Sequence, residues 1–403
     1  MQTQPKLDCS IDSEINSRTL KVLISVGEAS GDEHAAAVVQ SLIRLCPQAK
    51  VFGMGGSALR ASGMQTVVDS ETSASVMGLT EVIGSLGKII RAFRTLVQLA
   101  KEQKPDVVVL VDYPDFNLRL AKAISKFCPK IVYFISPQLW AWRSGRVEIV
   151  RKYISQVIPI FPFEEAFYAD RGVNAKFLGH PYTDREPQIV DRIGWARTFE
   201  LDPDRPIVAL LPGSRRAEIL RLAPLMTEAI SLVRKKIPQV QVVVALAPAL
   251  RQDWVSEQFG NLPGLRFVKG ASELLRVADA GIVASGTATV EAALAKLPFT
   301  VVYKLSDLTY AVGKRLVKGV KHIAMPNLVA GEEVVREFLQ HEATPENVAC
   351  ELENLLTDRD YTAAMRECLA EVARKLDYSS PEAREERTMS DRVAKAILET
   401  ARR

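Results

Sequence analysis

Short apolar runs alternate with amphipathic stretches along the first half of the chain. Asp106–Val111 is an almost unbroken apolar run, which is typical of a parallel strand covered by helices on both faces. Leu20–Val26, Ile131–Ile135 and Val157–Phe161 predict further strands, and Asp32–Leu45 predicts a helix. Strands that alternate with helices indicate right-handed βαβ units, and therefore a doubly wound parallel sheet.

A charged stretch with prolines, Asp184–Arg205, follows and predicts a linker. After it the alternation resumes, with a helix expected at Arg216–Lys235. The strands expected in this second set are Ile207–Leu211, Val240–Ala245, Leu265–Val268, Gly281–Ala284 and Phe299–Tyr303. The chain ends in helical, charged sequence. The simplest architecture is α/β, with two Rossmann-like doubly wound domains that face a crevice.

These patterns divide the 403 residues into four parts. We expect a loose N-terminal extension over 1–18, a first domain over 19–185, a second domain over 186–345, and C-terminal helices over 346–403. The extension lacks the apolar stretch of a secretory signal, and no run of about eighteen apolar residues occurs in the chain. We therefore expect a cytoplasmic protein or one that binds a membrane peripherally.

Composition excludes several classes of protein. With 52 Lys and Arg against 48 Asp and Glu, the net charge of +4 is too weak to indicate nucleic acid as the main partner. The apolar share of 47% and the charged share of 25% argue against disorder, collagen and coiled coil. The five cysteines include no CxxC pair, and the four histidines show no HExxH spacing. Free thiols and no metal site are expected.

Residues Glu81–Gln103 predict a helix whose apolar positions cover more than one face. Lys88, Arg91, Arg94 and Lys101 fall on the remaining face, and a basic amphipathic helix of this kind is typical of membrane surfaces. An ordinary buried helix with a solvated basic edge explains the same pattern. The segment alone leaves both interpretations open.

Two turns in the second half have the residues of an anion site. Gly213-Ser214-Arg215 follows a predicted strand, where a flexible turn, a hydroxyl and a guanidinium meet a helix start. Ser285-Gly286-Thr287 repeats this arrangement, and Glu291 lies one turn further on, suited to accept hydrogen bonds from a ribose diol. A nucleotide diphosphate site is the preferred interpretation, and a solvated turn or an ordinary helix cap is the alternative.

In the first half, Gly27-Glu28-Ala29-Ser30-Gly31-Asp32 joins a strand to a helix, but it is not the GxGxxG of a dinucleotide site. Asp112 ends the apolar strand, and ligands of open α/β sheets bind at the carboxyl ends of strands. Asp112 is therefore the leading candidate for a general base, with Glu28 and His180 as weaker ones. The alternative is a buried carboxylate that only holds the turn at Pro114.

These motifs together resemble the lipid-A-disaccharide synthases, the inverting glycosyltransferases of family 19. The resemblance runs in order from about Lys21 to about Gln340. The matching segments are Gly27-Glu28-Ala29-Ser30-Gly31-Asp32, Met77-Gly78-Leu79-Thr80-Glu81-Val82, Asp112-Tyr113-Pro114-Asp115-Phe116-Asn117, Ser136-Pro137-Gln138-Leu139-Trp140-Ala141-Trp142-Arg143, Pro162-Phe163-Glu164, Gly179-His180-Pro181, Leu211-Pro212-Gly213-Ser214-Arg215, Ser285-Gly286-Thr287 and Pro326-Asn327-Leu328-Val329-Ala330-Gly331.

The resemblance implies a GT-B architecture, with the donor nucleotide on the second domain. It implies transfer of 2,3-diacylglucosamine from UDP to 2,3-diacylglucosamine 1-phosphate, which gives a β(1→6)-linked precursor of lipid A. Asp112 is then expected as the general base, with Arg215 and Glu28 as further catalytic candidates. The residues expected to bind the donor are Gly213, Ser214, Arg215, Ser285, Gly286, Thr287, Glu291 and Asn327, the last through the resemblance alone.

The resemblance also implies that no metal or other cofactor is needed. It implies peripheral contact with an anionic membrane at the cytoplasmic face of the inner membrane, and it leaves a homodimer open. Two other functions remain as alternatives. A UDP-sugar 2-epimerase has a similar two-domain fold and the same diphosphate turns, but needs no apolar membrane helix. A nucleotide-binding module without catalysis has no use for Asp112 opposite a donor site.

Overall fold

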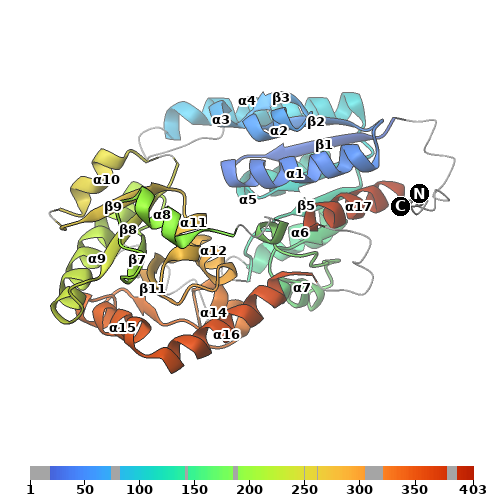
Figure 1. Ribbon diagram of the computed structural model, residues 1–403. Helices are drawn as coiled ribbons and strands as arrows, with labels where there is room; N and C mark the ends of the chain where they lie inside the picture. Colours follow the sequence, from blue (N-terminus) through green and yellow to red (C-terminus); the bar gives the residue numbers. More distant parts are fainter. Residues whose placement is uncertain are drawn as a thin grey trace, which may run out of the picture. The chain divides into compact units, whose positions relative to one another are not determined.

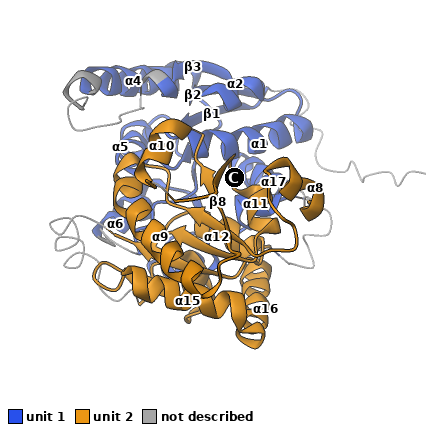
Figure 2. Cartoon of the chain, turned by 60° about the vertical axis from the view of Figure 1, so that its left-hand side comes forward, with its two compact units in different colours: residues 1–184, 378–403 blue, residues 185–377 orange. Residues whose placement is uncertain are grey.

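The computed structural model describes residues 19–73, 82–140, 144–184, 189–248, 250–260, 262–304, 321–378 and 388–403. The chain forms two compact units, which Figure 1 shows as ribbons and Figure 2 in two colours. Unit 1 comprises Met1–Asp184 and Tyr378–Arg403, and unit 2 comprises Arg185–Asp377.

Unit 1 is built on a six-stranded parallel sheet with the order β3-β2-β1-β4-β5-β6. Its strands are β1 (Lys21–Val26), β2 (Lys50–Gly55), β3 (Gln65–Asp69), β4 (Val107–Val111), β5 (Ile131–Phe134) and β6 (Gln156–Ile158). Its helices and 3₁₀ turns are α1 (Ala29–Leu45), α2 (Ser57–Ala61), α3 (Ser70–Ser73), α4 (Val82–Gln103), α5 (Pro114–Ile124), η2 (Ser144–Arg146), α6 (Val147–Tyr153), α7 (Pro162–Ala169), η3 (Pro181–Asp184) and α17 (Met389–Arg402).

Helices cover both faces of this sheet, and the pattern of β4 follows from that. Val108 and Leu110 pack in one apolar cluster with residues of α4 and α5. Val107, Val109 and Val111 point the other way and pack with residues of α1 and α17. Because successive side chains of a strand point to opposite faces, every position of β4 is apolar.

Unit 2 repeats the architecture with the strand order β12-β11-β10-β7-β8-β9. Its strands are β7 (Ile207–Leu211), β8 (Gln241–Leu246), β9 (Leu265–Lys269), β10 (Ala280–Ala284), β11 (Phe299–Tyr303) and β12 (Glu337–Leu339). Its helices are α8 (Arg192–Thr198), α9 (Arg216–Lys236), α10 (Gln252–Gln258), α11 (Ser272–Val277), α12 (Ala288–Leu294), α14 (Met325–Ala330), α15 (Pro345–Thr357) and α16 (Arg359–Leu376).

Counted along the chain, each sheet has the order third, second, first, fourth, fifth, sixth. This is the doubly wound order of nucleotide-binding Rossmann domains. The predicted fold class is therefore confirmed. Every strand predicted from the sequence is present within a few residues, and β2, β3 and β12 were not predicted.

The expected linker Asp184–Arg205 is wrong in part, because α8 lies inside it. The Asp191 carboxylate caps this helix by accepting the N–H groups of Ile193 and Gly194, both at 3.1 Å. Arg192 donates to both carboxylate oxygens of Asp279, at 3.1 and 2.9 Å. These contacts make the segment a packed element of unit 2.

The C-terminal helices expected over 346–403 are present, but they do not form one block. Helices α15 and α16 belong to unit 2, and α17 belongs to unit 1. Figure 2 shows α17 in the colour of unit 1. The end of the chain therefore completes the unit in which the chain begins.

Candidate functional site

In a doubly wound sheet, the strand order reverses at one point, and ligands bind there at the carboxyl ends of the strands. In unit 1 this point lies between β1 and β4, which are neighbours in the sheet. Glu28 follows β1 and Asp112 follows β4, so the structure brings these two candidates together. The turn is tight: a Cβ on Gly27 would lie 2.3 Å from the ring of Tyr113.

The backbone at Asp112 and Tyr113 is left-handed, with φ of 48° at both residues. This conformation is uncommon outside glycine and persists only where neighbouring groups hold it. The Asn117 amide donates to the carbonyls of Val111 at 3.1 Å and Asp112 at 2.8 Å. The Tyr133 hydroxyl donates to the Asp112 carbonyl at 2.7 Å. Buried polar groups therefore determine where the Asp112 carboxylate lies.

The electrostatics of Asp112 suit a base that works near neutral pH. The pKa of the Asp112 carboxyl is raised to about 6, because burial and, to a lesser degree, the negative charge of Glu28 together outweigh the opposing hydrogen bond from the Tyr113 N–H. Burial disfavours the charged carboxylate, and a nearby like charge adds to that effect. Glu28 itself is exposed at the N-cap of α1, and its side chain makes no capping hydrogen bond.

In unit 2 the corresponding point lies between β7 and β10, which are also neighbours. The two predicted anion-binding turns follow these strands, so both lie at the same edge of one sheet. Gly213 has a φ of +106°, and a Cβ there would lie 2.3 Å from Oε2 of Glu218. The glycine therefore meets both a conformational and a steric requirement of the first turn.

Sequence reasoning missed Glu218, which organises this first turn. Its Oε2 accepts the N–H groups of Ser214 at 3.1 Å and Arg215 at 3.3 Å, and its Oε1 lies 3.6 Å from the Arg215 guanidinium. The Arg215 side chain remains 81% exposed. Two backbone donors expected for a phosphate thus bind Glu218, and the guanidinium is left as the group that reaches outward.

The second turn is more open. Gly286 has a φ of +143°, and no atom lies within 4 Å of the place where its Cβ would be. The N–H groups of Gly286 and Thr287 have no hydrogen-bond acceptor among the described residues. Thr289 is buried, and its hydroxyl donates to the Gly286 carbonyl at 2.7 Å. Glu291 lies one turn into α12 and is half-buried.

A third strand end joins this group. Tyr303 ends β11, the neighbour of β10, and burial raises the pKa of its hydroxyl. The negative charge of Glu218 also raises that pKa, and the positive charge of Arg215 lowers it. Its position at the end of a predicted strand is the signal by which the sequence points to it.

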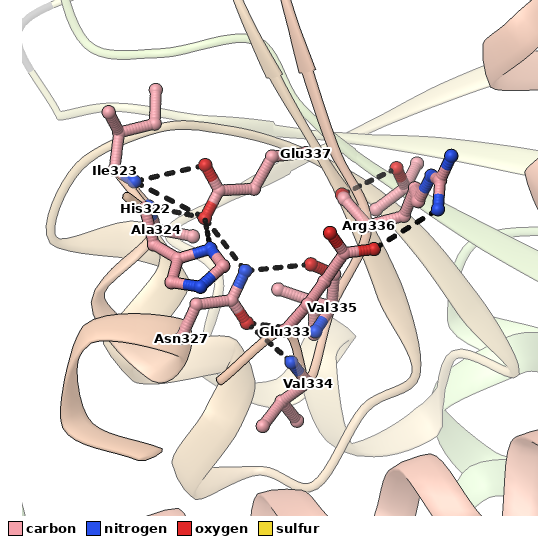
Figure 3. A network of polar contacts seen from close by, with 10 residues as sticks. His322, Ile323, Ala324, Asn327, Glu333, Val334, Val335, Arg336 and Glu337 are labelled. Carbon is pink, nitrogen blue, oxygen red and sulfur yellow. Dashed lines mark hydrogen bonds and ion pairs between the residues drawn. The ribbon is translucent and has the colours of Figure 1, made fainter. Parts of the chain in front are cut away.

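The structure does not place the Asn327 side chain at an open site, so its role in binding the donor stays a prediction from the resemblance alone. Its side chain is fully buried and all its hydrogen-bonding capacity is used inside unit 2 (Figure 3). The amide nitrogen donates to the Val335 carbonyl at 2.8 Å and to Glu337 at 2.7 Å. The amide oxygen accepts the N–H groups of Val334 and Val335 at 2.8 and 2.9 Å. Asn327 therefore holds the chain in place.

The helix predicted at Glu81–Gln103 is α4, and its two halves differ. Ala92, Leu96 and Ala100 are buried in the core of unit 1. In the first half, Leu86 is 54% exposed and Ile90 is 43% exposed. The matching segment 77–81 and the residues 141–143 lie outside the described residues. Within the described part of the chain, no helix has the length and hydropathy needed to cross a bilayer.

The family model of lipid-A-disaccharide synthetase matches residues 22–389 of the chain. The chain belongs to the lipid-A-disaccharide synthetase family. It is 41% identical to the lipid-A-disaccharide synthase of Geobacter metallireducens over 94% of this chain and 97% of the relative. It is 43% identical to that of Trichlorobacter lovleyi, over 89% of this chain and 94% of the relative.

The comparison with solved structures supports a GT-B fold. A UDP-N-acetylglucosamine 2-epimerase from Listeria monocytogenes aligns with a TM-score of 0.60 at 12% identity, over 94% of this chain and 95% of that chain. The glycosyltransferase SnogD from Streptomyces nogalater aligns with a TM-score of 0.55 at 17% identity, over 95% and 100%. At these identities the structures show the fold alone. Family membership makes the chain a glycosyltransferase of lipid A biosynthesis.

Proposed function

We propose that this enzyme transfers 2,3-diacylglucosamine from UDP to 2,3-diacylglucosamine 1-phosphate. The reaction forms a β(1→6)-linked disaccharide 1-phosphate and releases UDP. The observation that carries the proposal is the match to the lipid-A-disaccharide synthetase family over residues 22–389. The site geometry supports it, because each unit has chemically suited residues at the point where ligands of doubly wound sheets bind.

Asp112 acts as the general base in this proposal. The acceptor hydroxyl oxygen forms a bond to the anomeric carbon of the donor as the bond from that carbon to the UDP oxygen breaks. The hydroxyl proton passes to the Asp112 carboxylate, and a single displacement inverts the anomeric centre. A base with a pKa of about 6 is ionised at neutral pH and still accepts a proton in the transition state. Glu28 keeps a role as the neighbour that raises this pKa.

Unit 2 binds the donor in this proposal. The turn Ser285-Gly286-Thr287 receives the diphosphate on the backbone N–H groups of Gly286 and Thr287, and Arg215 stabilises the negative charge of the departing UDP. Gly213 and Ser214 form the turn that carries Arg215, and Glu291 accepts hydrogen bonds from the ribose. Asn327, which lies in α14, contributes by holding the segment that follows this helix, through Val334, Val335 and Glu337, as Figure 3 shows.

The enzyme docks peripherally on an anionic membrane in this proposal, at the cytoplasmic face of the inner membrane. Both proposed substrates carry acyl chains, so the enzyme must take them from a bilayer. The exposed Leu86 and Ile90 and the exposed cations Lys88 and Arg91 lie on the first half of α4. Apolar side chains insert, and each cation near an anionic surface contributes about 1 kcal/mol.

One assay tests the proposed reaction. Purified protein is incubated with UDP-diacylglucosamine and 2,3-diacylglucosamine 1-phosphate, and the product is identified by mass spectrometry. We expect a disaccharide 1-phosphate and an equal amount of UDP. A parallel incubation with UDP-N-acetylglucosamine measures C2 epimerisation, for which the structural neighbours give a reason. Epimerised sugar without disaccharide contradicts the proposal, and binding of UDP without either product indicates a module without catalysis.

A further inference from the structure

Six aromatic rings of unit 1 contact one another in a continuous row. The neighbouring ring centroids are 5.0–5.6 Å apart: Trp140 to Phe163 5.0 Å, Phe163 to Phe161 5.6 Å, Phe161 to His180 5.4 Å, His180 to Tyr182 5.1 Å, and Tyr182 to His34 5.5 Å. Trp140 follows β5, the two phenylalanines follow β6, and His34 lies near the start of α1. These segments all lie at the edge of the sheet where the strands end, and Asp112 lies at the same edge of the sheet.

The two middle rings of the row are buried, and the outer rings are partly exposed. Phe161 and His180 are each only 2% exposed, whereas Trp140, Phe163 and Tyr182 are partly exposed. Partly exposed aromatic rings on a buried support form a flat apolar surface with polar edges. Ligand sites are lined predominantly by such side chains. The proposed transfer and donor-binding steps use none of these rings.

A buried carboxylate fixes the indole of Trp140. Glu164 is fully buried, and it accepts the Trp140 Nε1–H at 3.0 Å and the N–H groups of Ile160 and Phe161 at 3.2 and 3.1 Å. No lysine or arginine among the described residues forms an ion pair with it. Burying a carboxylate is energetically costly. Capping the start of α7 does not require this burial, because an exposed glutamate can accept the same backbone N–H groups. The added bond to Trp140 links the loop after β5 to the loop after β6.

We propose that Trp140, held in place by Glu164, is a recognition residue for the sugar ring of the acceptor. The apolar face of a hexosamine, with its axial C–H groups, stacks on an aromatic ring, and the indole offers the larger surface. The sugar carries the attacking hydroxyl, so the sugar is the part of the acceptor that lies at the edge of Asp112. Glu164 acts through Trp140 and is a positioning residue. This inference rests on the proposed function of the enzyme.

The test compares the KM for acceptor with the KM for donor. Trp140→Ala removes the stacking surface, and we expect the acceptor KM to rise about tenfold while the donor KM changes less than about twofold. Trp140→Phe keeps a ring but loses the hydrogen bond, so its acceptor KM is expected between those of wild type and Trp140→Ala. Trp195→Phe is the matched control, because Trp195 donates to Glu273 at 3.1 Å in unit 2. Its acceptor KM is expected to stay at the wild-type value.

A double-mutant cycle tests Glu164. Because Glu164 acts through Trp140, Glu164→Gln is expected to raise the acceptor KM in the wild type and to add less than about twofold in Trp140→Ala. Glu165→Gln is the control on the same helix: Glu165 accepts the Phe177 N–H at 2.7 Å and does not contact Trp140. If the fold-increases in acceptor KM caused by Glu164→Gln and by Trp140→Ala multiply fully in the double variant, Glu164 is merely structural and this part of the proposal is wrong.

An acceptor with two-carbon acyl groups separates the sugar from the lipid. If Trp140 contacts the sugar, Trp140→Ala weakens the short-chain and the long-chain acceptor by the same factor. A loss confined to the long-chain acceptor assigns the ring to an acyl chain and overturns the proposal, as does an acceptor KM within twofold of wild type. If the wild type forms no disaccharide, the proposed function fails separately. Calorimetric binding of the short-chain acceptor to wild type and Trp140→Ala then still decides the role of Trp140.

Discussion

The backbone at Asp112 is left-handed, and neighbouring groups hold it in this conformation. This makes the role of the Asp112 carboxylate testable. The φ of 48° is enforced by Asn117 and Tyr133, which contact the Asp112 carbonyl and not its carboxylate. Asp112→Asn therefore preserves the turn and removes only the base. We expect turnover to fall at least about a hundredfold, with UDP binding unchanged.

Asp115→Asn is the matched control for this substitution. Asp115 lies three residues further along, is exposed, and pairs with Arg146 at the surface. Exposed pairs of this kind contribute little, so activity is expected within about twofold of wild type. A turnover of Asp112→Asn within a few-fold of wild type makes Asp112 structural, and Glu28 is then the next base to test.

The raised pKa of Asp112 predicts an acid limb in the rate profile. A base must be ionised to accept a proton, so kcat/KM is expected to fall as the pH drops through about 6. The Glu28 charge raises this pKa, so Glu28→Gln is expected to move the limb to lower pH. The profile is measured with a saturating concentration of donor from pH 5 to 8. An acid limb that stays in place in Glu28→Gln contradicts the assigned electrostatics.

At the scale of single residues, the sequence predicted residues that follow strand ends and missed residues that act through tertiary contacts. Asp112 and Arg215 were predicted because a strand pattern stops just before them. Glu218 and Glu164 were missed, because what each accepts becomes visible only when the chain is folded. Asn327 was assigned to a ligand because a motif match shows which residue is present, and not where its amide points.

At the scale of elements, α4 combines two interpretations that its sequence left open. Its second half is an ordinary core helix, and its first half exposes Leu86 and Ile90 beside basic residues. If the first half docks on lipid, Leu86→Ser with Ile90→Ser removes apolar surface that inserts. We expect binding to anionic vesicles to weaken about tenfold in a flotation assay, with the thermal unfolding temperature unchanged.

The control for this pair has equally exposed apolar residues elsewhere. Leu220 on α9 is 55% exposed and Ile193 on α8 is 52% exposed, and both belong to unit 2. Changing these two to Ser removes a similar apolar area without touching α4. Flotation of this control is expected to match wild type. Equal flotation of both double variants contradicts docking through α4.

The elements that the sequence failed to predict have weak patterns. Strand β2 contains two glycines, Gly53 and Gly55, and β12 is only three residues long. Helix α8 has seven residues inside a stretch of prolines and charges. Neighbouring elements stabilise them: β2 lies between β1 and β3, and Arg192 of α8 forms an ion pair with Asp279. Local patterns are strong only where an element buries a face by itself.

At the scale of the whole molecule, both units use one plan. Each places its candidate residues between the first and fourth strand of a sheet with the same order. Alternating strands and helices predicted the class, but the order of strands within a sheet depends on non-local pairing that no sequence window contains. The sequence did not predict that the chain returns to unit 1, because nothing in the local pattern of α17 indicates which unit the helix packs against.

Helix α17 is part of the core of unit 1, although it comes after the whole of unit 2 in the sequence. Val393 and Ile397 are fully buried in the cluster that contains β1, β4 and α1. The Arg392 Nε donates to the Leu178 carbonyl at 2.8 Å, and Asp184 accepts the Ser390 hydroxyl at 2.6 Å. The helix also explains Gly179 of a motif that no ligand step uses, because a Cβ there would lie 2.9 Å from the Arg392 guanidinium.

Ile397→Ala should therefore destabilise unit 1 specifically. Removing a buried isoleucine side chain typically costs about 2–5 kcal/mol, because packing is lost and a cavity remains. Glu399→Ala on the exposed face of α17 is the control, and its effect is expected within about 0.5 kcal/mol. With Trp195→Phe and Trp254→Phe as background, the remaining two of the four tryptophans belong to unit 1, so urea unfolding followed by fluorescence reports on that unit. If Ile397→Ala leaves the midpoint unchanged in this background, α17 is not a structural part of unit 1.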